Sequence, residues 1–367
     1  MKYFHYFLAV LVINVLWLEY GYTQPTDFRS YSENYICFRA RTPITIDGWI
    51  DEKEWYDAAW TCDFQDIEGD LKPKPLYRTR VKMLWDDDFF YIAAELQEPH
   101  IWATYTDRDA VIFHENDFEM FIDPDGDTHL YYELEINALG TIWDLMLVKP
   151  YRDGGPAINS WNIGGLKKGI KIFGTINNPS DTDDKWTVEL ALPWEVLKEA
   201  ASGKRRPQSG EHWRVNFSRV NWQLETKGGD YIKKINENTG SPIPEYNWVW
   251  SPQGVIAMHR PETWGYVQFA DRAQNPDHAV FIENRDESIK WALRQLYYRQ
   301  HAYFENNRSF TADPILLKVT DINLENMEFH PLIIVSAYLF EITQTSFDGS
   351  SVWHIQTDGR VWITRTD

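Results

Sequence analysis

Cysteine, basic residues and long apolar runs are scarce in this sequence. Only 2 of its 367 residues are cysteine, which excludes a small disulfide-built scaffold. Cys37 and Cys62 would either form one disulfide or remain as two buried thiols. Lysine and arginine number 36 against 55 acidic residues, so the net charge is −19. Nucleic acids and anionic membranes attract a basic surface, so this charge argues against both as partners.

The one long apolar run lies at the start of the chain. Residues 3–18 are apolar apart from His5 and Asn14, and they follow the positive charge of Lys2. The run is shorter than the ~20 residues of a membrane-spanning helix, and its layout is typical of a secretory signal peptide. We therefore expect residues 1–23 to be a signal peptide, the protein to be secreted or periplasmic, and no segment to span a membrane.

Most of the remaining sequence has the alternation of β-strands. Aromatic residues, which favour strands and can also stack on sugar rings, number 18 Trp, 20 Tyr and 19 Phe. Apolar and polar residues alternate at period 2 in the segments 118–122, 131–136, 187–192 and 213–220. Strands with one apolar and one polar face form antiparallel sheets that bury one side and leave the other in water. Several of them, separated by turn residues, predict an all-β antiparallel β-sandwich over residues 30–270.

The pattern changes after residue 270. Residues 288–304 carry apolar side chains at helical spacing, and strand-like stretches follow at 315–319, 332–342, 352–355 and 361–363. We expect residues 271–367 to form a small α+β appendage.

Six short motifs occur along the predicted sandwich in a fixed order. They are Ile44-Thr45-Ile46-Asp47-Gly48 with Asp51 to Trp55, Val81 to Asp86 with Phe90 to Ala93, Asn116 to Asp123, Glu133 to Asn137, Trp186 to Glu189 with Pro193-Trp194, and Trp250-Ser251 with Trp264-Gly265-Tyr266. Together they resemble the family 9-like carbohydrate-binding domains. The resemblance implies a sandwich that binds a glycan without catalysis, attached to or acting beside polysaccharide-degrading enzymes.

The resemblance also locates a ligand site, at which this sequence departs from its relatives. Some relatives hold a sugar between two tryptophans, and the motifs place those positions at Phe113 and Met258 here. An arginine of those binders falls at Glu135, so the fold transfers more directly than the ligand. Aromatic and charged residues near the loops would replace what is lost. The predicted carbohydrate-binding residues are Phe113, Trp143, Tyr151, Arg152, Trp161, Arg219, Trp222, Trp250, Met258 and His259.

Two stretches have a second interpretation. In the loop 144–155, Arg152 and Tyr151 would contact a sugar, or the loop would be a rigid connection with a surface ion pair. The polar side of the strand 216–220 would share a site with Glu133 and Glu135, or it would be an ordinary solvated sheet face.

Other functions and cofactors also have candidate residues. Met258 and His259 would be axial ligands if the sandwich bound haem without covalent attachment. A glycoside hydrolase would need two carboxylates about 5–10 Å apart, but no catalytic motif singles out a pair. The sequence requires no cofactor. Structural calcium bound by Asp123, Asp125 and Asp127 is the alternative to a hydrated acidic turn.

Overall fold

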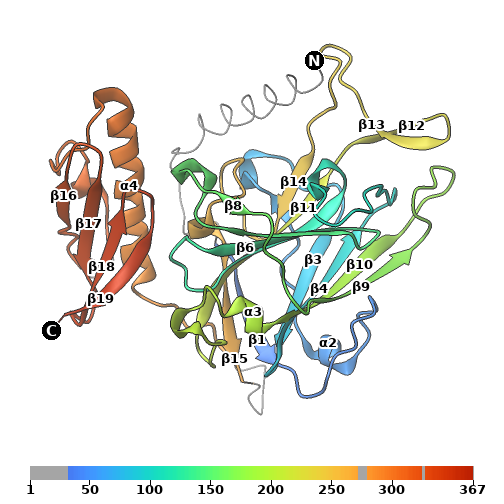
Figure 1. Ribbon diagram of the computed structural model, residues 1–367, viewed down its shortest axis with the longest axis horizontal. Coiled ribbons are helices and arrows are strands. Elements are labelled where there is room, and N and C mark those ends of the chain that lie inside the picture. Colours follow the sequence, from blue (N-terminus) through green and yellow to red (C-terminus); the bar gives the residue numbers. More distant parts are fainter. Residues whose placement is uncertain (1–31, 272–278, 325–326, 367) are drawn as a thin grey trace.

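The computed structural model describes residues 32–271, 279–324 and 327–366, so the expected signal peptide lies outside the described residues. A 13-stranded sheet accounts for most of the chain up to residue 270, and a separate 4-stranded sheet with one long helix follows it (Figure 1). Among the residues that the structure describes, no helix is long and apolar enough to cross a bilayer.

The large sheet runs in the order β8-β7-β6-β5-β11-β15-β1-β3-β4-β10-β9, with β14 beside β11 and β2 beside β14. Its strands are β1 (Asn34–Arg39), β2 (Gln65–Asp66), β3 (Thr79–Trp85), β4 (Phe89–Gln97), β5 (Asp117–Asp123), β6 (Tyr131–Asn137), β7 (Ile142–Leu147), β8 (Ala157–Ile158), β9 (Lys167–Phe173), β10 (Lys185–Pro193), β11 (His212–Asn221), β14 (Tyr246–Val249) and β15 (Gly265–Ala270). Two short helices, α2 (Lys53–Asp57) and α3 (Trp194–Leu197), and the hairpin of β12 (Leu224–Lys227) and β13 (Asp230–Lys233) lie outside this sheet.

The two halves of this sheet pack face to face across one apolar core. The buried residues of that core come from β5, β6 and β11 on one side and from β3, β4 and β10 on the other, and they include Phe118, Met120, Leu134, Phe217, Met83, Ile92, Val188 and Leu190. These residues are the apolar members of the period-2 pattern, which brings them all to one side of their strands. The predicted antiparallel β-sandwich is therefore confirmed, with β1 as a parallel strand between β15 and β3.

A buried glutamate fixes the loop that opens the family-like sequence. Glu189 on β10 accepts hydrogen bonds from the Asp47 and Gly48 main-chain N–H groups at 3.0 and 2.8 Å. It also accepts one from Trp55 Nε1 at 2.7 Å. Gly48 has φ of +92°, and a Cβ there would lie 2.5 Å from the Ile170 carbonyl carbon. The conformation and the lack of space both require glycine, so this motif is structural.

The prediction of one solvated face is wrong for β5, β6 and β11. Glu119, Glu133, Glu135 and Ser218 are all less than 7% exposed. Other segments cover this second face. The Phe113 main-chain N–H donates a hydrogen bond to Glu135, and Trp264 and Met258 pack on the same strands. Alternation showed which side chains share a face, but it did not show what covers that face.

The C-terminal part is a four-stranded antiparallel sheet packed against a helix. The helix is α4 (Glu287–Asn307), and the strands are β16 (Leu332–Val335), β17 (Phe340–Thr345), β18 (Ser351–Gln356) and β19 (Val361–Arg365). The predicted strand at 315–319 is wrong. Asp313 caps this segment by accepting from the Ile315 N–H at 2.8 Å, and its main chain makes helical-turn hydrogen bonds. The predicted strand 332–342 is two strands, because the chain turns between Ser336 and Leu339.

Both cysteines are free thiols, so of the two alternatives the disulfide does not form. Cys37 is buried in the sandwich core, whereas Cys62 is exposed.

Candidate functional site

Four carboxylates lie together on the outer side of β5 and β6, and we call this group the acidic face. Asp117 and Glu119 project from β5, and Glu133 and Glu135 from β6. Glu119 pairs in register with Glu135, so these two side chains are cross-strand neighbours on one face. None of the four is more than 6% exposed, which makes this group unusual for a sheet surface.

Burial and mutual repulsion keep these acids from ionising freely. Burial raises the pKa of Asp117 well above its usual range, and the neighbouring Glu119 raises it further. Burial also raises the pKa of Glu119, to about 7. The pKa values of Glu133 and Glu135 rise for the same reason, with a further contribution from the negative charge of Glu119. The acidic face therefore favours a cation or protons at neutral pH.

Three predicted aromatic residues lie beside the acidic face. Phe113 is 37% exposed, and its ring lies 6.4 Å from that of Trp143 at an interplanar angle of 27°. Its main-chain N–H donates to Glu135 at 2.9 Å, and Trp222 Nε1 donates to its carbonyl at 3.0 Å. Trp222 in turn lies under the ammonium group of Lys233, at 3.3 Å from the ring centre. We call Phe113, Trp143 and Trp222 the aromatic rim.

Tyr151, Met258 and His259 also meet on this side of the sandwich. The rings of Tyr151 and His259 lie 4.6 Å apart, and His259 Nδ1 is 3.0 Å from the Tyr131 hydroxyl. The Met258 sulfur accepts a hydrogen bond from Gln253 at 3.1 Å. Burial and the nearby Arg152 lower the pKa of His259 to about 3, so the ring stays neutral. Both proposed haem ligands are thus engaged with protein groups.

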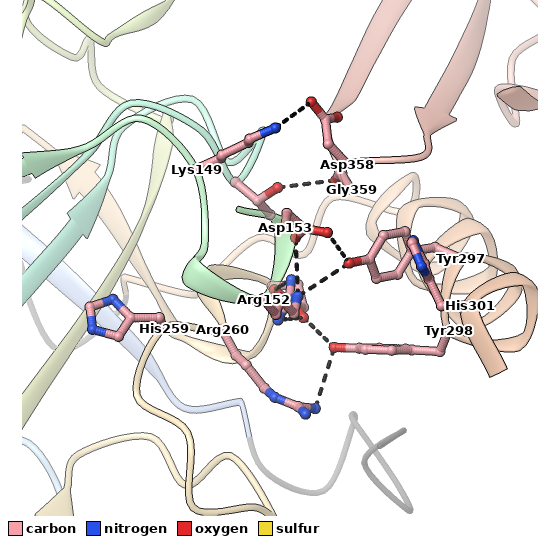
Figure 2. Close-up of polar contacts among 12 residues, drawn as sticks. Lys149, Arg152, Asp153, His259, Arg260, Tyr297, Tyr298, His301, Asp358 and Gly359 are labelled. Atoms are coloured by element: carbon pink, nitrogen blue, oxygen red, sulfur yellow. Dashed lines mark hydrogen bonds and ion pairs between the residues drawn. The ribbon is translucent and has the colours of Figure 1, made fainter. Parts of the chain in front are cut away.

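Arg152 is directed into the contact with the C-terminal part (Figure 2). Its guanidinium pairs with Glu262 at 2.9 Å and lies 3.3 Å from the Tyr297 hydroxyl. Tyr298 donates to the same Glu262 carboxylate, and Lys149 pairs with Asp358 at 3.5 Å. The loop 144–155 is therefore an interface between the sandwich and the C-terminal part, and Arg152 is not available to a sugar.

Two other predicted binding residues belong to the interior, and a third, Trp161, is half-buried against it. Trp250 is 1% exposed and lies in the core. Arg219 is 1% exposed and forms an ion pair with Glu98 at 2.7 Å. Trp161 stacks on Tyr132 with ring centres 4.6 Å apart and packs on the same core. Their positions next to loops in the sequence suggested exposure, but the burial of Trp250 and Arg219 removes both from the candidate site.

The predicted calcium residues form a hydrogen-bonded turn. Carboxylate oxygens of Asp123, Asp125 and Asp127 lie within 4.8 Å of one another. Asp123 accepts main-chain hydrogen bonds at both oxygens, at 3.0 and 2.9 Å. Asp127 accepts from the main chain of His129 and pairs with Arg360 at 3.0 Å. Calcium at this turn stays a prediction, because these contacts already hold the turn.

The acidic face as a whole was not predicted as a site, and Glu133 and Glu135 entered only as one alternative for the polar side of strand 216–220. The period-2 pattern placed Glu133 and Glu135 on one side of their strand, and the similar pattern of β5 placed Asp117 and Glu119 on one side of theirs. Only the register of β5 with β6 makes them a single group, and that register depends on contacts between distant segments.

The described residues form a β-sandwich with a covered polar face and a separate C-terminal α+β part. Residues 46–210, just under half of the chain, match the family described as carbohydrate family 9 binding domain-like.

Solved structures resemble this chain weakly. A carbohydrate binding module of family 9 from Caldicellulosiruptor kristjanssonii in complex with cellotriose is 14% identical, with a TM-score of 0.42. The match covers 69% of this chain and 100% of that one. A family 9 module from the same organism in complex with glucose is 14% identical over 66% of this chain and 98% of its own, with a TM-score of 0.41. No curated protein matches the chain.

Proposed function

We propose that this protein binds a carbohydrate and catalyses no reaction itself. The observation that carries the proposal is the family match over residues 46–210, together with an aromatic rim whose Phe113 ring is exposed. Aromatic rings bind the apolar C–H faces of sugars, and nearby polar groups supply the hydrogen bonds that orient the hydroxyls.

The charge of the protein restricts the ligand. The protein as a whole carries a net charge of −19. Repulsion between like charges then disfavours sugars with carboxylate or sulfate groups. The ligand is therefore a neutral or cationic glycan, bound on the outside of the sandwich.

The biological setting follows from the sequence and the family. The expected signal peptide would export the protein to the periplasm or beyond, where polysaccharides occur. A binding protein of this kind would act beside polysaccharide-degrading enzymes in carbohydrate catabolism, by keeping them near the substrate. Release of reducing ends from a bound polysaccharide by the purified protein would contradict the non-catalytic role.

A glycan-binding screen with the full chain tests the proposal. We expect at least one neutral or amino-sugar polymer to bind, and Phe113→Ala and Trp143→Ala to weaken that binding about tenfold or more, since loss of an aromatic sugar contact costs ~1–2 kcal/mol. Tyr56→Ala is the matched control, because Tyr56 is 72% exposed on α2, away from the rim. Equal binding by all four proteins would place the site elsewhere, and no binding across the screen would refute the function.

A further inference from the structure

Three carboxylates of the acidic face and one hydroxyl converge on a single buried point. Oxygens of Asp117, Glu119 and Glu135 all lie within 4.8 Å of one another. Ser218 on β11 pairs in register with Glu119, so its hydroxyl projects from the same face of the sheet. None of the four residues is more than 6% exposed.

One buried oxygen of this group has no partner among the described residues. Asp117 Oδ2 makes no hydrogen bond there, whereas the Ser218 hydroxyl interacts with Glu119. Asp117 also accepts a hydrogen bond from the Val220 N–H at 3.2 Å, and Glu135 accepts one from the Phe113 N–H. Among the described residues, none of the three carboxylates has a lysine or arginine partner within ion-pair distance. Buried polar atoms nearly always have a partner, so this arrangement calls for a ligand.

The chemistry of the group identifies the class of that ligand. Three carboxylates close together in a buried site would repel one another strongly, and a cation between them removes that repulsion. Calcium binds oxygen ligands at about 2.3–2.6 Å, so two oxygens on opposite sides of it are about 5 Å apart. The spacing of the three carboxylates fits this limit, and the site offers neither imidazole nor thiolate, the ligands that zinc and copper prefer.

The turn at Asp123, Asp125 and Asp127 provides an internal comparison. There, main-chain N–H groups and Arg360 already satisfy carboxylate oxygens. The site on β5, β6 and β11 has the same number of carboxylates but lacks such a partner at Asp117 Oδ2. Of the two clusters, the one formed by Asp117, Glu119 and Glu135 is therefore the one whose carboxylates need a cation.

We propose that Asp117, Glu119 and Glu135 bind a divalent cation of the calcium type, with the Ser218 hydroxyl as a fourth oxygen ligand. Glu135 also holds the main chain of Phe113, so the bound cation stabilises the segment that carries the aromatic rim. The proposal does not depend on glycan binding, because the ligand is the metal ion alone.

Calorimetric titration and thermal unfolding of the full chain test the proposal. After removal of metals with a chelator, calcium chloride should bind with measurable heat and raise the Tm by at least ~2 °C at saturation. Asp117→Asn and Glu135→Gln should each weaken calcium affinity tenfold or more. Asp125→Asn is the matched control and should bind as the wild type does. Magnesium chloride should bind more weakly, because it requires shorter and more regular coordination.

Three outcomes would overturn the proposal. The first is that neither ion binds the wild-type protein or changes its Tm. The second is that Asp125→Asn abolishes binding while Asp117→Asn does not, which would move the cation to the other turn. The third is that Asp117→Asn raises the Tm of the metal-free protein and the wild type remains insensitive to calcium, which would show that protons neutralise the acids. Far-UV circular dichroism of each variant verifies that the sandwich is folded, and Glu119→Gln replaces any variant that is not.

Discussion

Removing the Glu189 carboxylate should destabilise the sandwich more than any change at an exposed acid. Glu189→Ala leaves the N–H groups of Gly48 and Trp55 without acceptors, and both of these hydrogen bonds are buried. An unpaired buried donor costs about 1–3 kcal/mol, so the two together cost ~2–6 kcal/mol. Glu189→Gln keeps one acceptor oxygen but turns an amide N–H₂ toward the remaining donor, so we expect a loss of ~1–3 kcal/mol.

Urea unfolding monitored by far-UV circular dichroism measures these differences, with Glu195→Ala as the control. Glu195 lies in α3, just after the end of the same strand, and its side chain is 83% exposed and pairs with Lys198. Its removal should change the free energy of unfolding by less than ~0.5 kcal/mol. The expected order of stability is Glu195→Ala, then Glu189→Gln, then Glu189→Ala. If Glu189→Ala were as stable as Glu195→Ala, the view that this glutamate fixes the motif loop would be wrong.

Two further predictions concern the contact between the sandwich and the C-terminal part. Glu262→Ala removes one of the two carboxylates that pair with the buried Arg152, and Asp153 at 3.2 Å is the other, so it should lower the free energy of unfolding by ~1–3 kcal/mol and speed proteolytic release of the C-terminal part; unchanged stability would refute this. Burial would raise the pKa of Glu287, but Lys290 and Arg214 outweigh it and lower the pKa to about 2, below the ordinary 4.5. The carboxylate therefore contributes stability that is complete above pH 4.5 and is lost as the pH falls toward 2. We expect Glu287→Gln to be roughly 2–3 kcal/mol less stable than the wild type at pH 6 and equal to it near pH 2, and a difference independent of pH would contradict this assignment.

The sequence predicted the elements of the fold well because its local patterns agree with the tertiary structure. Phe118, Met120 and Ile122 alternate with polar residues, and all three lie in the core. The helical spacing of residues 288–304 corresponds to α4. The strand predicted at 315–319 failed because an apolar composition does not distinguish a strand from a capped turn, and Asp313 with Pro314 favours the turn.

The site was harder to predict because it depends on what covers each residue. Phe113 is exposed beside Trp143, as its position in the sequence suggested. Trp250 and Arg219 also lie in or beside predicted loops, yet Trp250 fills the core and Arg219 pairs with the buried Glu98. Arg152 is taken up by a contact with a segment more than 100 residues away. Such long-range partners leave no periodic signal in the sequence.

The position of the family match within the sheet has a practical consequence. Residues 46–210 include β3, β4, β9 and β10 from one half of the sheet and β5 to β8 from the other. The strands that join these halves, β11, β15 and β1, all lie outside the match. A fragment cut at the family boundaries would lack the strands that connect the two halves of the sheet, and the unpaired edges of β3 and β5 would be free to pair with other chains. The smallest fragment that keeps the connecting strands runs from β1 to β15, residues 34–270.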